Sequence, residues 1–371
     1  MIKKISSVFI VISVLLQTNI YAQGNKINFG AYYFDGWTGT FPYHITKSLV
    51  DSFPEREPKW GWITSSQKIM DEQILLAADA GLSFFSFCWF YSGREKYKYE
   101  VLNNSLRYYQ SSKNNDKLKY CIMISNHQGF EIGPEDWGFV SSEWIKYFKN
   151  RNYVTVDNKP IIAFFTISTL LQKFGSTSAL KNAISNLKTE AQQQGLAGVS
   201  VALCVPYNIS QEDIQTAESC GFDLLTGYNY HSAGFDKTTK IPVDTLKVVE
   251  TKVWDRIAVN SNLRYIPTTT LNWDPRPWAS SSNRYAKDPY YIGVSPTTVY
   301  NSITNCINWL NINSKNTTIE KIAFVYAWNE NGEGAYLTPS KNGVNLLEGV
   351  KRALYFQRSA ISREQKNLKR P

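Results

Sequence analysis

The chain has 371 residues, of which 43% are hydrophobic and 14% aromatic, and its formal net charge is +9 at pH 7. This composition excludes an intrinsically disordered chain and can supply a large buried core. Lys and Arg are dispersed along most of the sequence, which argues against a nucleic-acid-binding protein.

Residues 1–22 are predicted to be a signal peptide. Lys3 and Lys4 precede an apolar run from Val8 to Leu16, and Ala22 offers a small residue for cleavage. The run is too short to span a membrane, and no later stretch qualifies as a span. We therefore expect an exported protein, secreted or periplasmic, without stable membrane insertion. Removal of the two lysines, with no acidic residue in the segment, would lower the net charge from +9 to +7.

The remainder is predicted to be one folded domain, residues 23–358, followed by a basic tail, residues 359–371. The tail is basic from Arg363 to Arg370 and is expected to be a frayed end rather than a nucleic-acid-binding arm.

Strand-like and helix-like runs alternate through the domain, which is typical of parallel βα units. The predicted strands are Ile27–Tyr33, Leu82–Cys88, Tyr120–Ser125, Pro160–Thr166, Val199–Val205, Phe222–Thr226, Tyr265–Leu271 and Ile322–Trp328. The predicted helices are one that begins at Ser65 or Ser66 and ends at Ala80, then Tyr99–Ser111, Ser142–Lys149, Ala179–Gln194, Gln211–Cys220, Val243–Ala258, Thr297–Leu310 and Val344–Phe356.

Eight βα units with no strand left over predict a (β/α)8 TIM barrel, an α/β fold in a single domain. A doubly wound open sheet is the alternative, but it normally has fewer strands and often a Gly-rich phosphate-binding turn, and no Gly-x-Gly-x-x-Gly motif occurs. In a barrel the carboxyl ends of the strands carry the active site. The long connection from Trp37 to Ser65, rich in Pro, Trp and Gly, is a candidate wall of a cleft at that end.

The five cysteines form no Cys-x-x-Cys pair and show no Cys/His metal-binding spacing. They are Cys88, Cys121, Cys204, Cys220 and Cys306. Three lie inside strand-like runs, where Cys behaves as a small buried apolar residue. We expect no disulfide framework, no metal and no cofactor.

Aromatic rings and short polar groups gather just past the predicted strands. These positions include Asp35, Trp37, Trp89, Tyr91, Asn126, His127, Tyr207, Asn208, Tyr228, Tyr230, His231, Trp273, Asp274, Arg276, Trp328, Asn329, Glu330 and Glu333. Flat apolar faces beside hydrogen-bonding groups suit sugar rings, so the pattern predicts a sugar-binding cleft. The residues selected as substrate-binding are Asp35, Trp89, Asn126, His127, Tyr228, Trp273, Trp328 and Asn329.

Each of these residues also has a structural interpretation, in the core, at the rim or in a hydrogen bond. In a chain with 11 Trp and 23 Tyr, at least half of the selected aromatic rings are expected to be core or rim residues. His127 and His231 lack a third metal ligand at a recognisable spacing, so hydrogen bonding is favoured over zinc binding. No Gly-x-Ser-x-Gly elbow, P-loop or His-Glu-x-x-His motif occurs.

The candidate catalytic residues are Glu330 and Glu333, which follow the last predicted strand. They stand three residues apart, and Gly332 and Gly334 permit a turn there. A Gly-rich polar turn after a strand is often only a loop. Its position at the carboxyl end of the eighth strand favours acid and base catalysis.

The motif Trp328-Asn329-Glu330-x-x-Glu333-Gly334-x-x-Leu337-x-Pro339, followed by the segment from Leu346 to Leu354, resembles the C-terminal signature of the WbsX-like proteins and of glycoside hydrolase family 99. The block from Met70 to Gly81, leading into Phe84 to Trp89, is similar to the first helix and second strand of that family. In the family, Trp and His or Trp and Ala commonly separate the two acids. Here Asn331 and Gly332 do so, a departure that concerns the neighbouring sugar subsite and hence the specificity.

The resemblance implies a (β/α)8 barrel of the endo-α-mannosidase type, which cleaves an α-mannoside-like bond in an oligosaccharide or polysaccharide with retention of configuration. By analogy, Glu330 would take the proton of the sugar 2-hydroxyl, which attacks the anomeric carbon to give a 1,2-anhydro sugar. Glu333 would protonate the departing oxygen and later activate water.

Two alternatives stay open. The WbsX name favours a glycosyltransferase, but nucleotide sugars are lacking outside the cytoplasm and the sequence has no Asp-x-Asp motif. In a non-catalytic glycan-binding barrel, Asn331 and Gly332 would mark lost chemistry.

Overall fold

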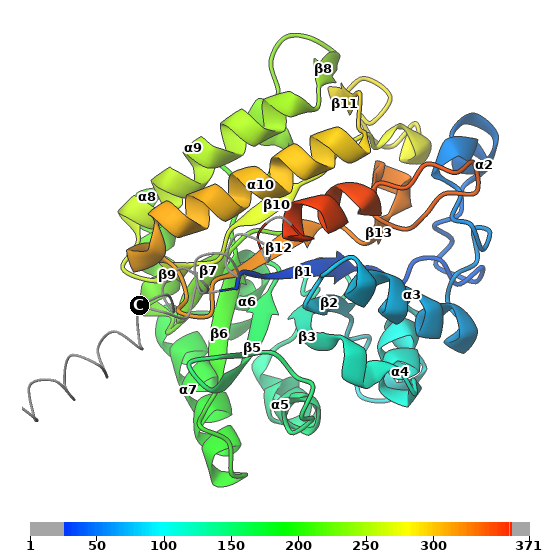
Figure 1. The fold of residues 1–371 in the computed structure, drawn as a ribbon. Coiled ribbons are helices and arrows are strands. Elements are labelled where there is room, and N and C mark those ends of the chain that lie inside the picture. The colour runs from blue at the N-terminus through cyan, green and yellow to red at the C-terminus, as the bar shows by residue number, and fades with distance from the viewer. Residues whose placement is uncertain (1–25, 356, 358–371) are drawn as a thin grey trace, which may run out of the picture.

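A computed structural model describes residues 26–355 and 357 (Figure 1). The predicted signal peptide, residues 1–22, and the predicted basic tail, residues 359–371, lie outside the described residues.

Parallel strands form the central sheet. They are β1 (Asn28–Tyr33), β2 (Phe84–Trp89), β3 (Lys119–Ile124), β5 (Lys159–Phe164), β6 (Ser200–Cys204), β7 (Leu224–Thr226), β9 (Arg264–Tyr265), β10 (Thr268–Thr270) and β12 (Ile322–Tyr326). Their order is β10-β12-β1-β2-β3-β5-β6-β7-β9, so that from β1 to β9 each of these strands lies beside the one that precedes it in the chain. The first and last members of this path, β10 and β9, are consecutive segments of the chain.

The sheet closes because β9 and β10 are two halves of one interrupted strand. Tyr265 in β9 pairs with β7, whereas Thr268 in β10 pairs with β12. Pro267 between them has no backbone N–H to give to a ladder. The Pro267 carbonyl nevertheless accepts a hydrogen bond of 2.9 Å from the backbone N–H of Phe324 in β12. The backbone N–H of Ile266 donates to the carbonyl of Leu225 in β7, also at 2.9 Å. Within residues 26–355 the path therefore closes as eight strands, and the predicted (β/α)8 barrel is confirmed.

Helices cover the outside of this barrel, as Figure 1 shows. They are α3 (Gln67–Asp79), α4 (Asn104–Ser111), α5 (Pro134–Phe148), α6 (Ile167–Phe174), α7 (Thr177–Gln193), α8 (Gln211–Ser219), α9 (Asp244–Asn260), α10 (Pro296–Ile312) and a last helix over 347–355. Local sequence sets several of their ends. The Ser66 hydroxyl accepts from the backbone N–H of Ile69 at the start of α3, and Ser210 and Asp213 form a reciprocal capping box at the start of α8.

The helices of the structure differ from the predicted ones in three main places. Helix α5 begins at Pro134 rather than near Ser142, because Pro is accepted at the first helical position and acidic residues follow it in the first turn. Helix α6 was not predicted. The predicted helix from Tyr99 to Ser111 is divided into η2 (Tyr97–Tyr99), η3 (Val101–Asn103) and α4, since the Glu100 carboxylate caps a new turn by accepting from Leu102 N–H at 3.3 Å.

Large aromatic side chains fill the barrel interior. The rings of Tyr32 and Phe324 stack with centroids 4.8 Å apart, and Phe84 meets Phe324 edge-on at 5.5 Å. Gly30 makes room for this packing, because a Cβ at that position would lie 2.0 Å from the Phe84 ring. The interior is therefore a packed core rather than a channel.

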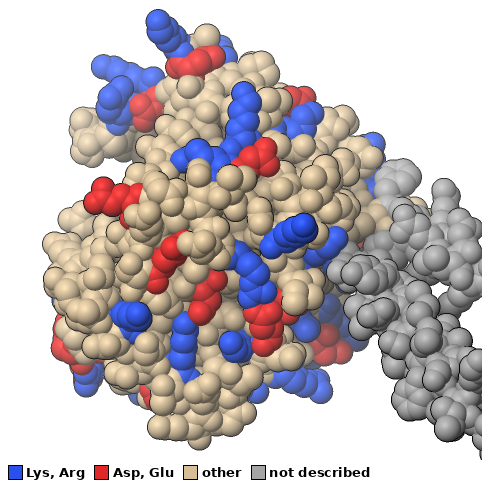
Figure 2. All heavy atoms as spheres, turned by 90° about the vertical axis from the view of Figure 1, so that its left-hand side faces the viewer, with Lys and Arg blue, Asp and Glu red and all other residues tan. Residues whose placement is uncertain are grey.

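The β1 arrow in Figure 1 points toward the carboxyl ends of the strands. The same side of the molecule carries α2 (Lys47–Ser52) and β13 (Asn329–Glu330). The left-hand side of Figure 1 faces the viewer in Figure 2, where basic and acidic side chains are interspersed. Ion pairs such as Lys188 with Asp223, 2.7 Å apart, illustrate this mixing of signs at the surface.

All five cysteines lie within the described residues, where they are buried and free of disulfide bonds. Among residues 26–355 and 357, no helix is long and apolar enough to cross a bilayer.

Helix α9 places a carboxyl group against the interrupted strand. Glu250 is fully buried. Its carboxyl oxygens accept from the backbone N–H of Thr270 at 2.7 Å and from the Thr269 hydroxyl at 3.2 Å. Burial raises the pKa of Glu250 to about 8, although both hydrogen bonds oppose the shift. The neutral carboxyl group of Glu250 thus provides an acceptor for the backbone N–H of Thr270, which has no partner in the β-ladder.

Replacing Glu250 with Gln keeps an acceptor for Thr270 and removes the ionisation. The folded protein holds this proton up to about pH 8, whereas the unfolded chain releases it near 4.5. The stability from this group is therefore complete below about pH 4.5 and is lost as the pH rises toward about 8. We expect Tm to fall less steeply over this range in Glu250→Gln than in the wild type. Glu348→Gln, at an exposed position, is the matched control, and equal slopes for Glu250→Gln and the wild type would contradict the assignment.

Candidate active site

A cavity of about 1180 Å³ opens at the carboxyl end of the barrel, and both Glu330 and Glu333 line it. Its aromatic lining consists of Phe34, Phe41, Tyr43, Phe90, Tyr99, Phe130, Phe165, Tyr228, Trp278 and Tyr285. Some of these follow strands directly, and others come from the connections after β1, β2 and β10. Glu330 and Glu333 therefore face a pocket whose walls contain many aromatic side chains.

Glu330 lies at the bottom of this cavity and is 5% exposed. Its Oε1 accepts a hydrogen bond of 2.6 Å from the Tyr228 hydroxyl, while its Oε2 is buried without a partner among the described residues. Burial raises the pKa of Glu330 to about 7, and the hydrogen bond from Tyr228 holds it below the value that burial alone would give. The carboxyl group can thus change its protonation state near neutral pH.

Glu333 is half-buried, and its carboxyl group faces the same cavity. Burial raises its pKa well above the ordinary value. Among the described residues, no side chain donates a hydrogen bond that would counteract this shift. The pKa of Tyr228 is raised, first by burial and then by the nearby Cys88, Glu330 and Glu333.

A short hairpin carries the two acids. It consists of β13, the turn η8 (Asn331–Glu333) and β14 (Ala335–Tyr336), and Glu330 pairs with Ala335 across it. Gly334 adopts φ +70°, a conformation that favours glycine and that lets the chain reverse directly after Glu333. The backbone N–H of Asp274 donates to the Glu333 carbonyl at 2.7 Å, which attaches the turn to the connection after β10.

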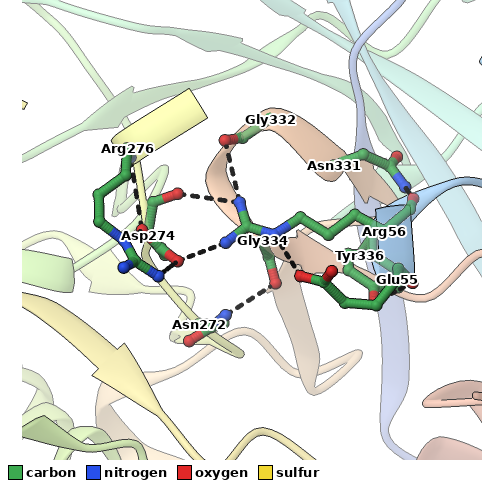
Figure 3. A network of polar contacts seen from close by, with 9 residues as sticks. All are labelled: Glu55, Arg56, Asn272, Asp274, Arg276, Asn331, Gly332, Gly334 and Tyr336. Carbon is green, nitrogen blue, oxygen red and sulfur yellow. Dashed lines mark hydrogen bonds and ion pairs between the residues drawn. The ribbon is translucent and has the colours of Figure 1, made fainter. Parts of the chain in front are cut away.

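Arg56 holds this hairpin from the other side (Figure 3). It belongs to η1 (Pro54–Arg56), in the connection after β1, and is 5% exposed. Its guanidinium donates to the carbonyls of Asp274 at 3.0 Å and Gly332 at 3.3 Å, and it forms an ion pair with the Asp274 carboxylate. In return, the Asn331 side-chain amide donates to the Arg56 carbonyl at 2.8 Å.

Arg276 completes the charge balance of this network, which Figure 3 shows between the hairpin and its two supporting connections. It donates to both carboxylate oxygens of Asp274, at 2.7 and 2.8 Å. Burial raises the pKa of Asp274, but the hydrogen bonds from Arg276 and the charges of Arg56 and Arg276 outweigh burial and lower it. Asp274 is therefore an anion that fixes Arg56 in place.

Gly332 and Asn331, the residues between the two acids, have structural reasons for their identity. A Cβ at Gly332 would lie 2.3 Å from the Trp278 ring, so only glycine allows the indole to lie against the turn. The Asn331 side chain is turned away into the network around Arg56. Trp278 thus supplies, from a different connection, an aromatic wall beside the acid pair.

Two of the eight residues selected as substrate-binding, His127 and Tyr228, line the cavity. Tyr228 also contacts Cys88, with its oxygen 3.7 Å from the Cys88 sulfur. The His127 Nδ1 lies 3.0 Å from the Gln128 carbonyl.

The other six do not line the cavity, which differs from the sequence expectation. The Asn329 side chain pairs with the backbone of Phe34 in both directions, at 2.9 and 2.6 Å. Trp328 is fully buried and donates to Gln73 at 3.0 Å. Both residues therefore fasten the strand ends to their surroundings.

The remaining four of these residues are also engaged within the protein. Asp35 accepts from the Ser65 hydroxyl at 3.0 Å and from the backbone N–H of Ser105 at 2.6 Å. Asn126 bonds to backbone around Thr166, Trp89 packs against Trp144, and Trp273 stacks on His231. Their position past a strand was identified correctly, but sequence does not reveal whether such a side chain points into the cavity or toward the helices.

Several cavity residues were not selected from the sequence. Phe34, Phe90 and Phe165 directly follow strands β1, β2 and β5, so the same strand-end criterion could have included them. His44, Trp278 and Tyr285 lie within long connections, where no spacing pattern distinguishes them. Among the described residues there is no group of three or more His, Cys, Asp or Glu side chains suited to a metal ion.

Comparisons with known proteins agree with this fold. A family model described as Glycosyltransferase WbsX matches residues 61–349, which confirms the resemblance noted in the sequence. A glycoside hydrolase-like protein superposes with a TM-score of 0.62 at 13% identity, over 89% of this chain and 94% of that one. The GH99 endo-alpha-mannosidase from Bacteroides thetaiotaomicron superposes with a TM-score of 0.59 at 13% identity, over 91% of this chain and 98% of that one. At these identities the superpositions show a shared fold, and a search of curated protein sequences finds no significant match.

Replacement of Arg56 by Met should test the network that holds the hairpin. It leaves the buried Asp274 carboxylate with one cation instead of two and the Gly332 carbonyl without its donor. Removing one partner of a buried ion pair typically costs about 3 kcal/mol or more of unfolding free energy. We expect a loss of this size in chemical denaturation, together with faster amide hydrogen exchange over 329–336. Arg94→Met removes an ion pair with Asp136 at the surface and should leave the midpoint nearly unchanged. Equal effects of the two substitutions would contradict the role of Arg56.

Proposed function

The chain belongs to the WbsX family, and from this premise we propose that it is a glycoside hydrolase acting on an α-mannoside-like or related bond in an oligosaccharide or polysaccharide. The observation that carries the proposal is the placement of two carboxyl groups, the buried Glu330 and the half-buried Glu333, on one hairpin in a cavity with many aromatic side chains. Dehydrated carboxyl groups with raised pKa values are suited to proton transfer near neutral pH. Aromatic walls suit the C–H faces of sugar rings.

The different surroundings of the two acids support a division of roles. Glu330 receives the Tyr228 hydrogen bond, which stabilises its anion, so it is the better base. Glu333 has no such donor among the described residues and keeps its proton more readily, so it is the better acid. In the proposed reaction, Glu330 takes the proton from the sugar 2-hydroxyl while that oxygen attacks the anomeric carbon. Glu333 donates its proton to the departing oxygen.

The second half of the reaction restores the enzyme. Glu333, now a carboxylate, takes a proton from a water molecule that attacks the anomeric carbon of the 1,2-anhydro sugar. The bond between that carbon and the 2-oxygen breaks, and Glu330 returns its proton to the 2-oxygen. The anomeric carbon is inverted twice, so the proposed reaction retains its configuration.

A glycosyltransferase is the second candidate, because the matching family is described with that activity. A nucleotide-sugar donor would bring a diphosphate into the cavity. Among the described residues, the charged side chains that line it are mostly acidic, since Glu95, Glu100 and the proposed base Glu330 accompany one lysine, Lys96. Anionic walls oppose binding of a diphosphate, whereas they accept sugar hydroxyl groups. We therefore favour hydrolysis, and we propose that it takes place outside the cytoplasm after export directed by residues 1–22.

Substitution of each acid by Gln tests the proposal. The purified mature protein is first screened against plant, fungal and host glycans, with products followed by mass spectrometry. Glu330→Gln and Glu333→Gln should each lower the turnover of a natural glycan by at least about a hundredfold, because each removes a proton-transfer group. A dinitrophenyl glycoside, whose leaving group needs no acid, should be cleaved by Glu333→Gln but not by Glu330→Gln.

Glu212→Gln, an exposed position on α8, is the control for these substitutions and should keep wild-type turnover. Near-full activity of either acid variant on the natural glycan would defeat the assignment. If the wild-type protein binds a glycan but releases no product after long incubation, a non-catalytic glycan-binding barrel is the correct description.

The hydrogen bond from Tyr228 to Glu330 should affect the pH dependence of kcat/KM. Activity requires ionised Glu330, so kcat/KM should rise with pH through a pKa of about 7 in the wild type. Tyr228→Phe removes the donor that favours the anion, so the rising limb should move to higher pH. Tyr153→Phe removes a buried hydroxyl group outside the cavity and should leave the limb in place. An unchanged limb in Tyr228→Phe would contradict the role of Glu330 as base.

A further inference from the structure

Three exposed aromatic side chains stand at the rim of the cavity. Phe41, Tyr43 and Tyr99 are 78%, 72% and 81% exposed, and all three belong to its lining. Among the described residues, the one other strongly exposed aromatic ring is that of Tyr355, which is not part of the lining. The remaining aromatic side chains of the described residues are buried or partly buried, so the exposed rings are concentrated around this opening. Such a concentration of exposed apolar surface marks a binding site.

The three rings come from two different connections. Phe41 and Tyr43 lie between β1 and α3 and meet edge to face, with centroids 6.2 Å apart. Tyr99 ends η2, in the connection that follows β2. We call these three residues the aromatic rim. Because both connections also line the cavity that contains the acids, the rim is continuous with the candidate active site.

Contacts on both connections hold the rim in place before any ligand binds. His44, next to Tyr43, donates through Nδ1 to the Pro42 carbonyl at 2.9 Å. The Thr46 hydroxyl donates to the Pro277 carbonyl at 2.9 Å, which fixes the segment to the connection after β10. Tyr97 is buried two residues before Tyr99, and its hydroxyl donates to Glu143 on α5 at 2.6 Å. A rim that is already fixed loses less conformational entropy when a ligand binds.

Charged groups lie among these rings. Glu95, Lys96 and Glu100 line the same part of the cavity, beside Tyr99 in the sequence. The core of a protein interface is usually depleted of such charges, so a second copy of the chain is a poor occupant. Apolar ring faces alternating with hydrogen-bonding side chains match the surface of a sugar, which has C–H faces and hydroxyl edges. The cavity also exceeds the roughly 300–1,000 Å³ of pockets that hold one small ligand.

We propose that the aromatic rim is an outer carbohydrate-binding site, which takes sugar residues of the glycan beyond those held at Glu330 and Glu333. The inference rests on the proposed function, since it assumes that the same glycan chain reaches the acids. It implies that the protein distinguishes glycans by length. A long chain engages both the rim and the acids, whereas a short one engages only the acids.

The rate experiment compares substrates of different length. The variants are the double substitution Phe41→Ala with Tyr43→Ala and the single substitution Tyr99→Ala, in the full mature chain. The substrates are a dinitrophenyl monoglycoside, a disaccharide and an octasaccharide of whichever screened glycan is cleaved. We expect kcat/KM on the octasaccharide to fall roughly two- to tenfold for each ring removed, and kcat/KM on the monoglycoside to fall much less. Tyr355→Ala, which removes the exposed ring away from the cavity, should match the wild type on all three.

Binding is measured separately so that it does not depend on catalysis. Glu330→Gln proteins with and without the rim substitutions are run by affinity electrophoresis in gels that contain yeast α-mannan or one of the other screened polysaccharides. The intact rim should retard the protein several-fold more strongly than the substituted rim. Circular dichroism and Tm of the variants establish that the exposed substitutions leave the fold intact.

The outcomes separate the two proposals. Equal losses on short and long substrates, or equal retardation with and without the rim, would overturn the outer site while leaving the hydrolase intact. Failure of every polysaccharide to retard the Glu330→Gln protein would also overturn it. Rim-dependent retardation without product from the wild type would sustain the site and reject the hydrolase. Self-association that the rim substitutions abolish, seen by analytical ultracentrifugation, would assign the rim to a second copy of the chain instead.

Discussion

The dehydration of two carboxyl groups on one hairpin is the constraint that the surrounding structure satisfies. A buried carboxyl group resists ionisation and tends to move toward water, so its position must be imposed by its backbone. The hairpin itself is too short to impose it, because an isolated two-stranded hairpin is marginally stable. Arg56, Asp274 and Asn331 supply the missing rigidity by attaching the turn to two connections from other parts of the barrel. Contacts from several parts of the barrel thus offset the unfavourable free energy of removing the two carboxyl groups from water.

The barrel makes this arrangement possible because it brings distant segments to one end. Tyr228 and Glu330 are separated by 102 positions in the sequence, yet their oxygens are 2.6 Å apart. The interrupted strand at Pro267 lets one segment bond to β7 and then to β12, so the elements that carry these two residues are joined through it. Where the β-ladder is interrupted, the Glu250 side chain accepts a hydrogen bond from the backbone N–H of Thr270. The same fold that closes the sheet therefore fixes the distance between Glu330 and its hydrogen-bond donor.

Sequence reasoning identified the eight strands, the barrel and the acid-bearing turn, because each of these leaves a local pattern of apolar runs, turns and glycines. It was less informative about which strand-end side chains face the cavity. Trp328 and Asn329 precede Glu330 directly, but one inserts between helix and sheet and the other binds the backbone of Phe34. Trp278 and the aromatic rim depend on how long connections fold back over the barrel. That geometry arises from tertiary contacts such as Thr46 with Pro277, which have no periodic signal.

The contact between Gly332 and Trp278 couples two positions that are far apart in the sequence. A side chain at 332 can be accommodated only if the indole leaves, and loss of the indole opens space that a side chain at 332 could fill. Relatives that diverge at one of these positions should therefore diverge at both, so that the pair is inherited as a unit. Transplanting the acid-bearing turn alone from one family member to another would then produce a steric conflict, unless the segment that carries the indole moved with it.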